Sequence, residues 1–522
     1  MNVLIPCAGI GSRLGHFTKN FNKAMIQVGS KPVISHIIEN YPITTKFIIA
    51  LGYKGSHIKE FLSLAYPKRK FKFVFVSNFD GPGSGLTHTL RKCSKFINGS
   101  FIFHANDSLI LKNNYIKNLK KDTIILSNKS SDSIRYRTAS IKKKFISKLF
   151  DKKNFQIKNV YNYIGVSFIK DHKYFLKSIN NDNHNLGEVS YFLNLISNKK
   201  KINFKITNSW FDIGDTNDYR RVNNQYMGIN ILPKNDQGIF FLQNKVYKFF
   251  TNPKIIQKRY NRSIDLKNIV PKIFKKKKYF YTYNFVKGKI LSNSNDIDSD
   301  LKNLLSWSES CLWKPKKLNK TQINKFYDNC HNFYYEKTLN RIDNFFSKND
   351  LIDKECKINN VIVPSLSNLI KLIDWKEISN GFPVGYHGDF HFENIIKVKK
   401  KKFCLLDFRE SFGNLEKIGD IYYDLAKLKH GFELNHKIIK NELFSIKENK
   451  GNINFKIYKK KNFKNCEKIL DDFIIEKGLS PNKVEILKNL IFLNIAALYS
   501  FPYGNFLYYM GKYKLYNSII KT

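Results

Sequence analysis

Over the first part of the chain, to about residue 220, short apolar runs alternate with stretches whose apolar residues recur every three or four positions. Runs such as NVLIPCA (2–8), KFIIALGY (46–53) and SFIFHAN (100–106) have the length and composition of buried strands, and the segments between them are amphipathic. Strands that alternate with helices predict a layered α/β domain.

The pattern changes after residue 228. The Pro and Gly of GINILPKNDQG predict a linker between 228 and 237. Beyond it, GIFFLQNKVYKFFTN (238–252) reads as a hairpin, YFYTYNFVKGKIL (279–291) reads as a strand pair, and the chain from about 320 is mostly helical in pattern except at 385–410. The sequence therefore predicts two domains, an α/β domain at 1–228 and an α+β domain at 237–522.

Composition supports two domains and raises the question of an anionic partner. The 522 residues exceed one ordinary core, and 90 Lys and Arg against 42 Asp and Glu give a formal charge of +48. Such a charge suits an anionic partner such as nucleic acid, a membrane surface or phosphorylated substrates. The lysines are scattered, however, and Lys, Asn, Ile, Phe and Tyr are all used heavily, as compositional drift would produce. We expect no nucleic-acid partner; an RNA-binding protein would gather its lysines and aromatics on one face.

The cysteines and the apolar segments bear on location. Seven cysteines without a CxxC pair predict neither a disulfide framework nor a zinc site, and they fit a reducing cytoplasm. No basic region precedes the first apolar run, so no secretory signal is expected. The most apolar window, 490–510, contains Asn494, Pro502 and Gly504 and predicts a buried C-terminal helix rather than a membrane span.

The first candidate site follows the first predicted strand. In LIPCAGIGSRLG the strand leads into a glycine turn, Gly9 and Gly11, followed by Ser12 and Arg13. Glycines at such a turn let backbone N–H groups approach phosphate oxygens. The dinucleotide-binding fingerprint is incomplete, because Leu14 stands where it needs glycine, and the phosphate-loop pattern is absent.

This turn opens a longer series of motifs. With NKAMIQVGSKP, GPGSGLTHTL, FHANDSL, GEVSYFLNLI and FDIGDTNDY in that order, the first domain resembles the nucleotidylyltransferases that activate sugar phosphates and choline phosphate. The resemblance implies a Rossmann-like three-layer (GT-A-like) fold, a nucleoside triphosphate substrate and Mg²⁺. It assigns the triphosphate to Gly9, Gly11, Ser12 and Arg13, the α-phosphate to Lys23, the base to Gly83 and Gly85, and Mg²⁺ to Asp107 and Asp212.

The chemistry demands these residue types independently. A phosphate that attacks another phosphate must overcome anion repulsion, so the site needs a metal and a cationic clamp. Asp107 and Asp212 at predicted strand ends suit the metal, although both could be ordinary turn carboxylates. Lys152 is a candidate for the acceptor's phosphate and Glu188 for its hydroxyl or amine, with a surface position as the alternative for each. Asn22 stands where this family often has proline, which leaves the acceptor open.

A second candidate site lies in GYHGDFHFENII (385–396) and the LLDFRE that follows. Metal-dependent transfer of a γ-phosphoryl group needs an Asp at the attacking hydroxyl, an Asn on the same loop for Mg²⁺, and a second Asp at a strand end. Asp389, Asn394 and Asp407 have this order and spacing. With GDIYYDLAKL, the segment resembles the aminoglycoside phosphotransferase and choline kinase families, which implies a bilobal protein-kinase-like domain that uses ATP and Mg²⁺.

The resemblance also distributes roles in the second domain. It makes Asp389 the catalytic base, Asn394 and Asp407 metal ligands, and His387 a residue that orders the loop. Lys248 is the candidate for gripping the nucleotide phosphates, with a surface lysine as the rival reading, because Arg262 stands where a partner glutamate is expected. His391 is interpreted as structural, and Asp420 and Asp424 as braces of the site.

Together the two sites predict a bifunctional cytoplasmic enzyme. One domain would phosphorylate a small hydroxyl substrate, a sugar in the first instance, with ATP. The other would join the product to a nucleotidyl group from a second NTP, giving a nucleotide sugar for surface polysaccharide. The alternatives are a choline or amino-alcohol kinase with a cytidylyltransferase, a basic nucleic-acid-binding protein, and a scaffold with one inactive domain, which the complete residue sets disfavour.

Overall fold

The computed structural model describes residues 1–111, 118–129, 134–152, 157–225, 236–435, 438–439, 441–449, 451–458, 463–499 and 501–520. These residues form two compact units. Unit 1 comprises Met1–Pro253 and Lys275–Thr282, and unit 2 comprises Lys254–Phe274 and Tyr283–Thr522. The predicted linker lies outside the described residues at 228–235.

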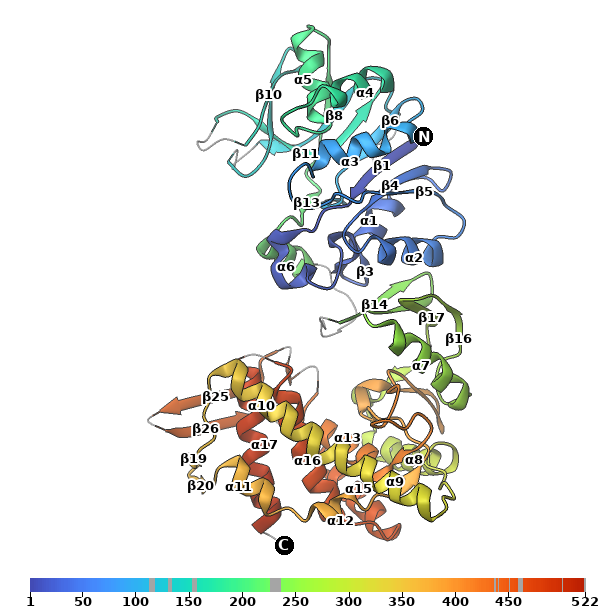
Figure 1. Ribbon diagram of the computed structural model, residues 1–522, viewed down its shortest axis with the longest axis vertical. Helices are drawn as coiled ribbons and strands as arrows, with labels where there is room; N and C mark the ends of the chain where they lie inside the picture. Colours follow the sequence, from blue (N-terminus) through green and yellow to red (C-terminus); the bar gives the residue numbers. More distant parts are fainter. Residues whose placement is uncertain are drawn as a thin grey trace. The chain divides into compact units, whose positions relative to one another are not determined.

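Unit 1 is built on a nine-stranded sheet whose centre is parallel (Figure 1). Strand β1 pairs in parallel with β4 and β6, and β4 pairs in parallel with β5; β11 runs antiparallel to β6. The main order is β10 (Phe145–Phe150), β9 (Thr138–Lys142), β11 (Tyr161–Ile169), β6 (Phe101–His104), β1 (Asn2–Cys7), β4 (Lys46–Leu51) and β5 (Lys70–Phe75), and β8 (Thr123–Lys129) pairs with β11 and β12 (Asn203–Ile206).

Helices cover both faces of this sheet. Along β1 the side chains alternate between two hydrophobic cores: Val3, Ile5 and Cys7 belong to one and Leu4 to the other. Both faces must therefore be covered, as in parallel α/β sheets generally. The first core is covered by α1 (Val33–Glu39), α2 (Gly55–Ala65) and α6 (Thr216–Gln225), and the second by α3 (Leu86–Cys93), α4 (His172–Asn180) and α5 (Val189–Ser197). The predicted three-layer α/β arrangement is confirmed for this unit.

A small sheet after the predicted linker has the order β14 (Gln237–Leu242), β15 (Lys245–Phe250), β17 (Phe280–Asn284) and β16 (Ile273–Lys276). Its hairpin agrees with the prediction for 238–252. Phe240, Phe249 and Phe280 pack in the same core as Phe61 of α2. The hairpin therefore belongs to unit 1, whereas the predicted boundary placed it in the second domain.

Unit 2 is mostly helical. Its helices are α7 (Pro253–Asp265, from Lys254 on), α8 (Ile297–Cys311), α9 (Lys320–His331), α10 (Lys337–Asn349), α11 (Leu366–Lys371), α12 (Trp375–Ser379), α13 (Ile421–Glu433), α15 (Lys464–Glu476), α16 (Pro481–Ala496) and α17 (Tyr503–Ile520). Its short strands are β18 (Lys289–Ile290), β19 (Cys356–Ile358), β20 (Val361–Val363), β21 (Pro383–Val384), β22 (Ile395–Lys399), β23 (Lys402–Leu405), β24 (Gly419–Asp420), β25 (Phe444–Asn449) and β26 (Asn452–Ile457).

The apolar window at 490–510 is not one helix, as predicted, but the end of α16 and the start of α17. Pro502 lies immediately before α17, where its ring and missing N–H cannot continue a helix. The residues of both helices pack into the core of unit 2. Within the described part of the chain, no helix is long and apolar enough to cross a membrane.

A buried charge cluster joins three of these helices. Glu433 of α13 is 2% exposed, and its carboxylate pairs with Lys488 Nζ of α16 at 2.6 Å and with Lys514 Nζ of α17 at 2.7 Å. Burial alone would raise the pKa of Glu433, but the two lysines outweigh it and lower the pKa to about 2. The ionised form is therefore strongly favoured in the folded state.

Glu433→Gln is expected to lower the free energy of unfolding of unit 2 by about 1–3 kcal/mol, because the partly exposed Lys514 loses its counter-charge while Lys488 keeps Glu485 at 2.6 Å. The contribution should be present above pH 4.5 and disappear as the pH falls from 4.5 toward 2, since the folded-state pKa is lowered. Urea unfolding can be followed by tryptophan fluorescence, because three of the four tryptophans, Trp307, Trp313 and Trp375, lie in unit 2. Glu476→Gln, at a carboxylate 72% exposed, is the control; an equal loss there would contradict the prediction.

Candidate active sites

Asp107 and Asp212 lie beside one another in unit 1. Strand β7 (Ser108–Ile110) begins directly after Asp107, and β13 (Trp210–Asp212) ends with Asp212. The strands are antiparallel with Asp212 opposite Ser108, and the Ile213 N–H donates to the Asp107 carbonyl at 3.1 Å. The pairing brings together two carboxylates from distant parts of the sequence.

The charges around this pair are unequal. Lys23 Nζ lies 2.6 Å from Asp107 Oδ2. Burial would raise the pKa of Asp107, but the charges of Lys23 and Arg13 outweigh it and the pKa is lowered. The pKa of Asp212 is raised, first by burial and then by the negative charge of Asp107. Two carboxylates that influence one another in this way suit a hard divalent cation such as Mg²⁺, which is commonly bound by one or two carboxylates and by substrate phosphates.

The side chain before Lys23 explains how the lysine is positioned. Asn22 is fully buried, and its amide donates to the carbonyls of Cys7 at 2.9 Å and Tyr53 at 2.7 Å. Its Oδ1 accepts from the Ala24 N–H at 2.9 Å and so caps the short 3₁₀ helix Lys23–Met25. Asn22 therefore ties the lysine turn to the end of β1, which is a structural reason for asparagine at this position.

The glycine turn is held against the same lysine. Gly11 has φ 74°, and a Cβ there would meet the Lys23 Cβ and the Thr18 Cγ2 at 3.2 Å. The Thr18 hydroxyl donates to the Gly11 carbonyl at 3.1 Å. Ser12 and Arg13 follow in the 3₁₀ helix Ser12–Thr18 and are exposed. A substituted residue 11 would thus be strained in its backbone and would crowd Lys23.

The second glycine motif begins α3. Gly85 has φ 133°, and a Cβ there would lie 2.1 Å from the Asn185 side chain. The Thr87 N–H donates to Asn185 Oδ1 at 2.9 Å, and the Gly187 N–H donates to Thr87 Oγ1 at 2.9 Å. Gly83 also has positive φ, at 76°. The turn is therefore packed against the segment before α5, and close approach requires glycine at 85.

Glu188 and Lys152, the candidate acceptor ligands, both lie near Arg137. Glu188 is buried, accepts from the Tyr163 hydroxyl at 3.0 Å, and keeps Oε2 without a hydrogen-bond partner among the described residues. Burial raises the pKa of Glu188 against the opposing charge of Arg137. Lys152 is largely exposed; partial desolvation, and then the charges of Arg13 and Arg137, lower its pKa. A surface position is therefore wrong for Glu188.

Sequence reasoning missed Arg135. Its guanidinium forms ion pairs with Asp215 and Asp218 and lies 3.7 Å from Asp212 Oδ2. Asp215 also caps α6, since its Oδ1 accepts from the N–H groups of residues 217 and 218. The acidic segment FDIGDTND signals a need for positive charge, but no motif marks the distant Arg135 as its source.

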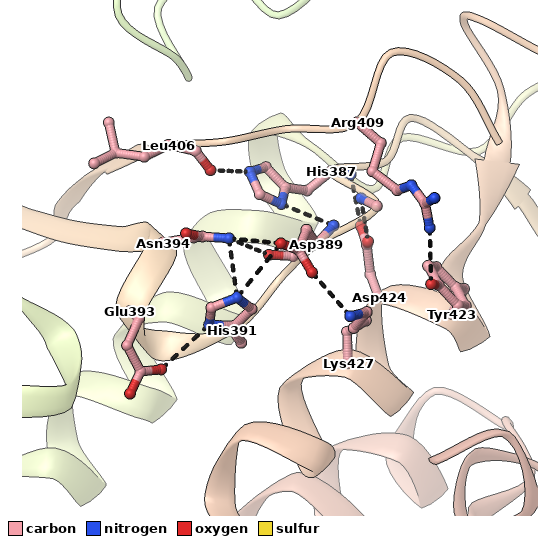
Figure 2. Close-up of polar contacts among 11 residues, drawn as sticks. His387, Asp389, His391, Glu393, Asn394, Leu406, Arg409, Tyr423, Asp424 and Lys427 are labelled. Carbon is pink, nitrogen blue, oxygen red and sulfur yellow. Dashed lines mark hydrogen bonds and ion pairs between the residues drawn. The ribbon is translucent and has the colours of Figure 1, made fainter. Parts of the chain in front are cut away.

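In unit 2 the residues of the GDFHFEN segment converge on Asp389 (Figure 2). Asn394 Nδ2 donates to Asp389 Oδ2 at 3.0 Å, and Lys427 Nζ lies 2.9 Å from Asp389 Oδ1. His391 lies 3.5 Å from Asp389 Oδ2 and 3.2 Å from Glu393 Oε2. Burial would lower the pKa of His391, but the two carboxylates raise it to about 9.

The buried His387 shapes this loop. One ring nitrogen, Nε2, bonds the Leu406 carbonyl at 2.8 Å, and the other, Nδ1, accepts from the Asp389 N–H at 3.2 Å. Burial lowers the pKa of His387 to about 4, so the ring is neutral near pH 7. Asp424 of α13 accepts from the N–H groups of His387 at 2.8 Å and Gly388 at 2.7 Å. His387 and Asp424 thus fix the backbone that presents Asp389.

Asp407 is held beside the same loop by its neighbours. The Leu406 N–H donates to the Asn394 carbonyl at 2.7 Å, and the Arg409 N–H donates to the His387 carbonyl at 3.0 Å. Asp407 lies between these two bonds with φ 57°, two residues after the end of β23. The structure therefore brings the segments of Asp389, Asn394 and Asp407 together, and the roles of these residues stay predictions.

Two further cations have positions that the sequence did not reveal. Lys427 pairs with Asp389, although it was not identified as a site residue. Arg262 of α7 is buried, donates to the Tyr386 carbonyl at 2.7 Å, and lies 4.2 Å from the centre of the Tyr386 ring. It orders the residues before His387. Lys248 is buried on β15 in unit 1, so its role toward ATP stays a prediction.

Comparisons with known proteins bear on unit 1. The chain is 24% identical over 243 residues to the bifunctional protein GlmU of Methanococcus vannielii, which covers 45% of this chain and 56% of that protein. It is 38% identical over 65 residues to the glucose-1-phosphate cytidylyltransferase of Salmonella typhimurium, covering 12% and 25%. The CTP:phosphocholine cytidylyltransferase of Streptococcus pneumoniae matches in structure with 19% identity and a TM-score of 0.36, over 43% of this chain and 98% of that chain.

These matches relate the N-terminal part of the chain to nucleotidyltransferases. The chain spans about half or less of the length of these two curated relatives. No protein-family model matches it. The kinase-like identity of unit 2 stays a prediction.

Proposed function

We propose that the protein is a bifunctional cytoplasmic enzyme in which unit 2 phosphorylates a small hydroxylated acceptor with ATP and unit 1 transfers a nucleotidyl group from a second NTP to the product. The observation that carries the proposal is that each unit has its own polar cluster: in unit 1 two paired strands bring Asp107 and Asp212 together, and in unit 2 Asn394 donates to Asp389 on one loop, to which the segment of Asp407 is hydrogen-bonded. The product of the first reaction is a phosphomonoester, which is the substrate class of the second. The final product would be an activated nucleotide sugar for surface polysaccharide.

In unit 1 the residues present fit a metal-assisted attack of the phosphomonoester on the α-phosphate of the NTP. Asp107 and Asp212 would hold Mg²⁺, which neutralises phosphate charge when bound. Lys23 then exchanges its partner Asp107 for the α-phosphate, and Arg13 with the Gly9–Arg13 turn holds the β- and γ-phosphates. Glu188, which is buried and has one oxygen without a hydrogen-bond partner in the described part of the chain, binds a hydroxyl or amine of the acceptor. Pyrophosphate leaves.

In unit 2 Asp389 accepts the proton of the attacking hydroxyl while the γ-phosphoryl group passes from ATP to the acceptor oxygen. Asn394 and Asp407 would hold Mg²⁺, which would supply positive charge against the phosphates of ATP. The backbone bonds from Asp424 and His387 fix the loop, so little reorganisation is needed at the moment of transfer. Lys427 pairs with Asp389 Oδ1 and competes with the acceptor for this oxygen.

The proposal is tested by the mass of the product. The full-length protein is incubated with Mg²⁺, ATP, a mixture of CTP, UTP, GTP and dTTP, and a panel of sugars and amino alcohols. We expect one acceptor to gain a nucleoside diphosphate, and to gain only a phosphate when ATP is the sole nucleotide. EDTA should abolish both products. Nucleotidyl transfer to supplied phosphomonoesters, without phosphorylation of any acceptor, would refute the kinase half of the proposal.

A further inference from the structure

Four cationic side chains lie near Asp389, on the side where the acceptor of the phosphoryl group would bind. The two carboxylate oxygens of Asp389 face different groups: Asn394, a proposed metal ligand, contacts Oδ2, and Lys427 contacts Oδ1 (Figure 2). Lys427 therefore lies on the side of the carboxylate away from the metal ligand. Three further cations belong to the same neighbourhood, namely Lys337 and Arg341 of α10 and Arg409, which follows β23.

Two aromatic rings hold this group together. Lys337 Nζ lies 3.6 Å from the centre of the Phe333 ring and 5.7 Å from that of Tyr423. The Arg409 guanidinium lies 5.5 Å from the Phe333 ring centre and donates to the Tyr423 hydroxyl at 3.1 Å. Tyr423 lies on α13, one turn before Lys427. Arg341 follows Lys337 by one helical turn, which places both on one face of α10.

The group is short of negative charge. Among the described residues, the side chains of Lys337, Arg341 and Arg409 form no ion pair. Lys427 pairs with Asp389, whose carboxylate also contacts Asn394 and His391. Glu410 contributes negative charge near Arg409, but it already lies 3.4 Å from Arg259. Burial, and then the charges of Arg409, Lys427 and Arg341, lower the pKa of Lys337 well below its usual value. Cations collected in this way are costly unless an anion joins them.

We propose that the acceptor phosphorylated by unit 2 carries an anionic group, a carboxylate or a phosphate, which binds Lys337, Arg341 and Arg409 while its hydroxyl faces Asp389. This inference rests on the proposed kinase function. The hydroxyl oxygen forms a bond to the γ-phosphorus of ATP, the bond from that phosphorus to the bridging oxygen breaks, ADP leaves, and Asp389 takes the hydroxyl proton. The same cations repel an amino alcohol or choline, so the alternative of a cationic acceptor is disfavoured.

The test compares four hexoses that differ in charge: glucose, glucosamine, glucuronate and glucose 6-phosphate. ADP release from ATP by the full-length protein gives kcat/KM for each. We expect one or both anionic hexoses to exceed glucose by about 100-fold, with glucosamine last. The glucuronate and glucose 6-phosphate arms distinguish a carboxylate from a phosphate as the bound group.

Variants locate the effect. Lys337→Met and Arg341→Met should each raise KM for the anionic hexose by about 10- to 100-fold with little change in kcat, since they remove binding and not chemistry. Lys325→Met, at an exposed lysine of α9, should change neither. Nucleotidyl transfer by unit 1 and the unfolding temperature report whether each variant is folded.

Equal use of glucose or glucosamine, or an unchanged KM in both α10 variants, would overturn the anionic acceptor while the kinase proposal stands. If no hexose is phosphorylated, calorimetric titration with glucuronate and with inorganic phosphate tests the anion site directly. Binding that is lost in Lys337→Met supports the anion site and counts against the kinase. The anion site is overturned if neither ligand binds, or if the Lys337→Met protein binds them as well as the unchanged protein does.

Discussion

Asp389→Asn is expected to lower the rate of ATP-dependent phosphorylation by about 10²- to 10⁴-fold, the range that a general base contributes. The amide keeps the size of the side chain and can still bond Asn394, but it cannot take the proton of the attacking hydroxyl. It also removes the counter-charge of Lys427, which lies 2.9 Å from Oδ1. ADP release and the phosphorylated product are measured with the acceptor that the mass experiment identifies.

The same variant separates the two units. Nucleotidyl transfer from NTP to a supplied phosphomonoester, measured as pyrophosphate release, should proceed at the rate of the unchanged protein. Asp472→Asn, at an exposed carboxylate of α15, is the matched control and should leave both activities intact. If Asp389→Asn abolishes both activities in a protein that still unfolds cooperatively, the division into two sites is wrong.

The sequence predicted the elements of unit 1 well because their signals are local. The runs at 2–8, 46–53 and 100–106 contain β1, β4 and β6. The side chains of β1 point alternately into the two cores. The predicted boundary was less successful. The hairpin β14–β15 joins unit 1 through Phe240 and Phe249 against the distant Phe61, and no local pattern reveals such packing.

The same distinction applies to the candidate sites. Motif spacing could predict the proximity of Asp389, Asn394 and Asp407 because they lie on one loop and just after a neighbouring strand, where sequence distance limits spatial distance. Lys427 escaped because it lies on α13 among buried apolar residues and reaches Asp389 only when that helix packs beneath the loop. Arg135 escaped for the same reason: its partners Asp215 and Asp218 are distant in sequence. Tertiary packing, and not periodicity, places these cations.

For unit 1, Asp107→Asn and Asp212→Asn are each expected to lower nucleotidyl transfer by about 10²- to 10³-fold, because each removes one proposed ligand of the metal that stabilises the phosphate charge. Phosphorylation by unit 2 should not change. Pyrophosphate release with the supplied phosphomonoester measures the first activity and ADP release the second. Asp171→Asn is the control, since asparagine caps a helix as well as aspartate does and Asp171 is the N-cap of α4.

The two variants should differ in stability although they share the loss of activity. Asp107→Asn leaves Lys23, which is 6% exposed, without its carboxylate at 2.6 Å, and we expect unit 1 to be destabilised by about 3–5 kcal/mol. Asp212→Asn keeps that ion pair and removes the like charge that, after burial, raises the pKa of Asp212, so stability should be unchanged or slightly higher. Urea unfolding followed by circular dichroism measures both. A stable but inactive Asp212→Asn protein cannot owe its defect to an unpaired lysine, so it would isolate the metal-binding role of the carboxylate pair. A stable and fully active Asp212→Asn protein would remove Asp212 from the proposed mechanism.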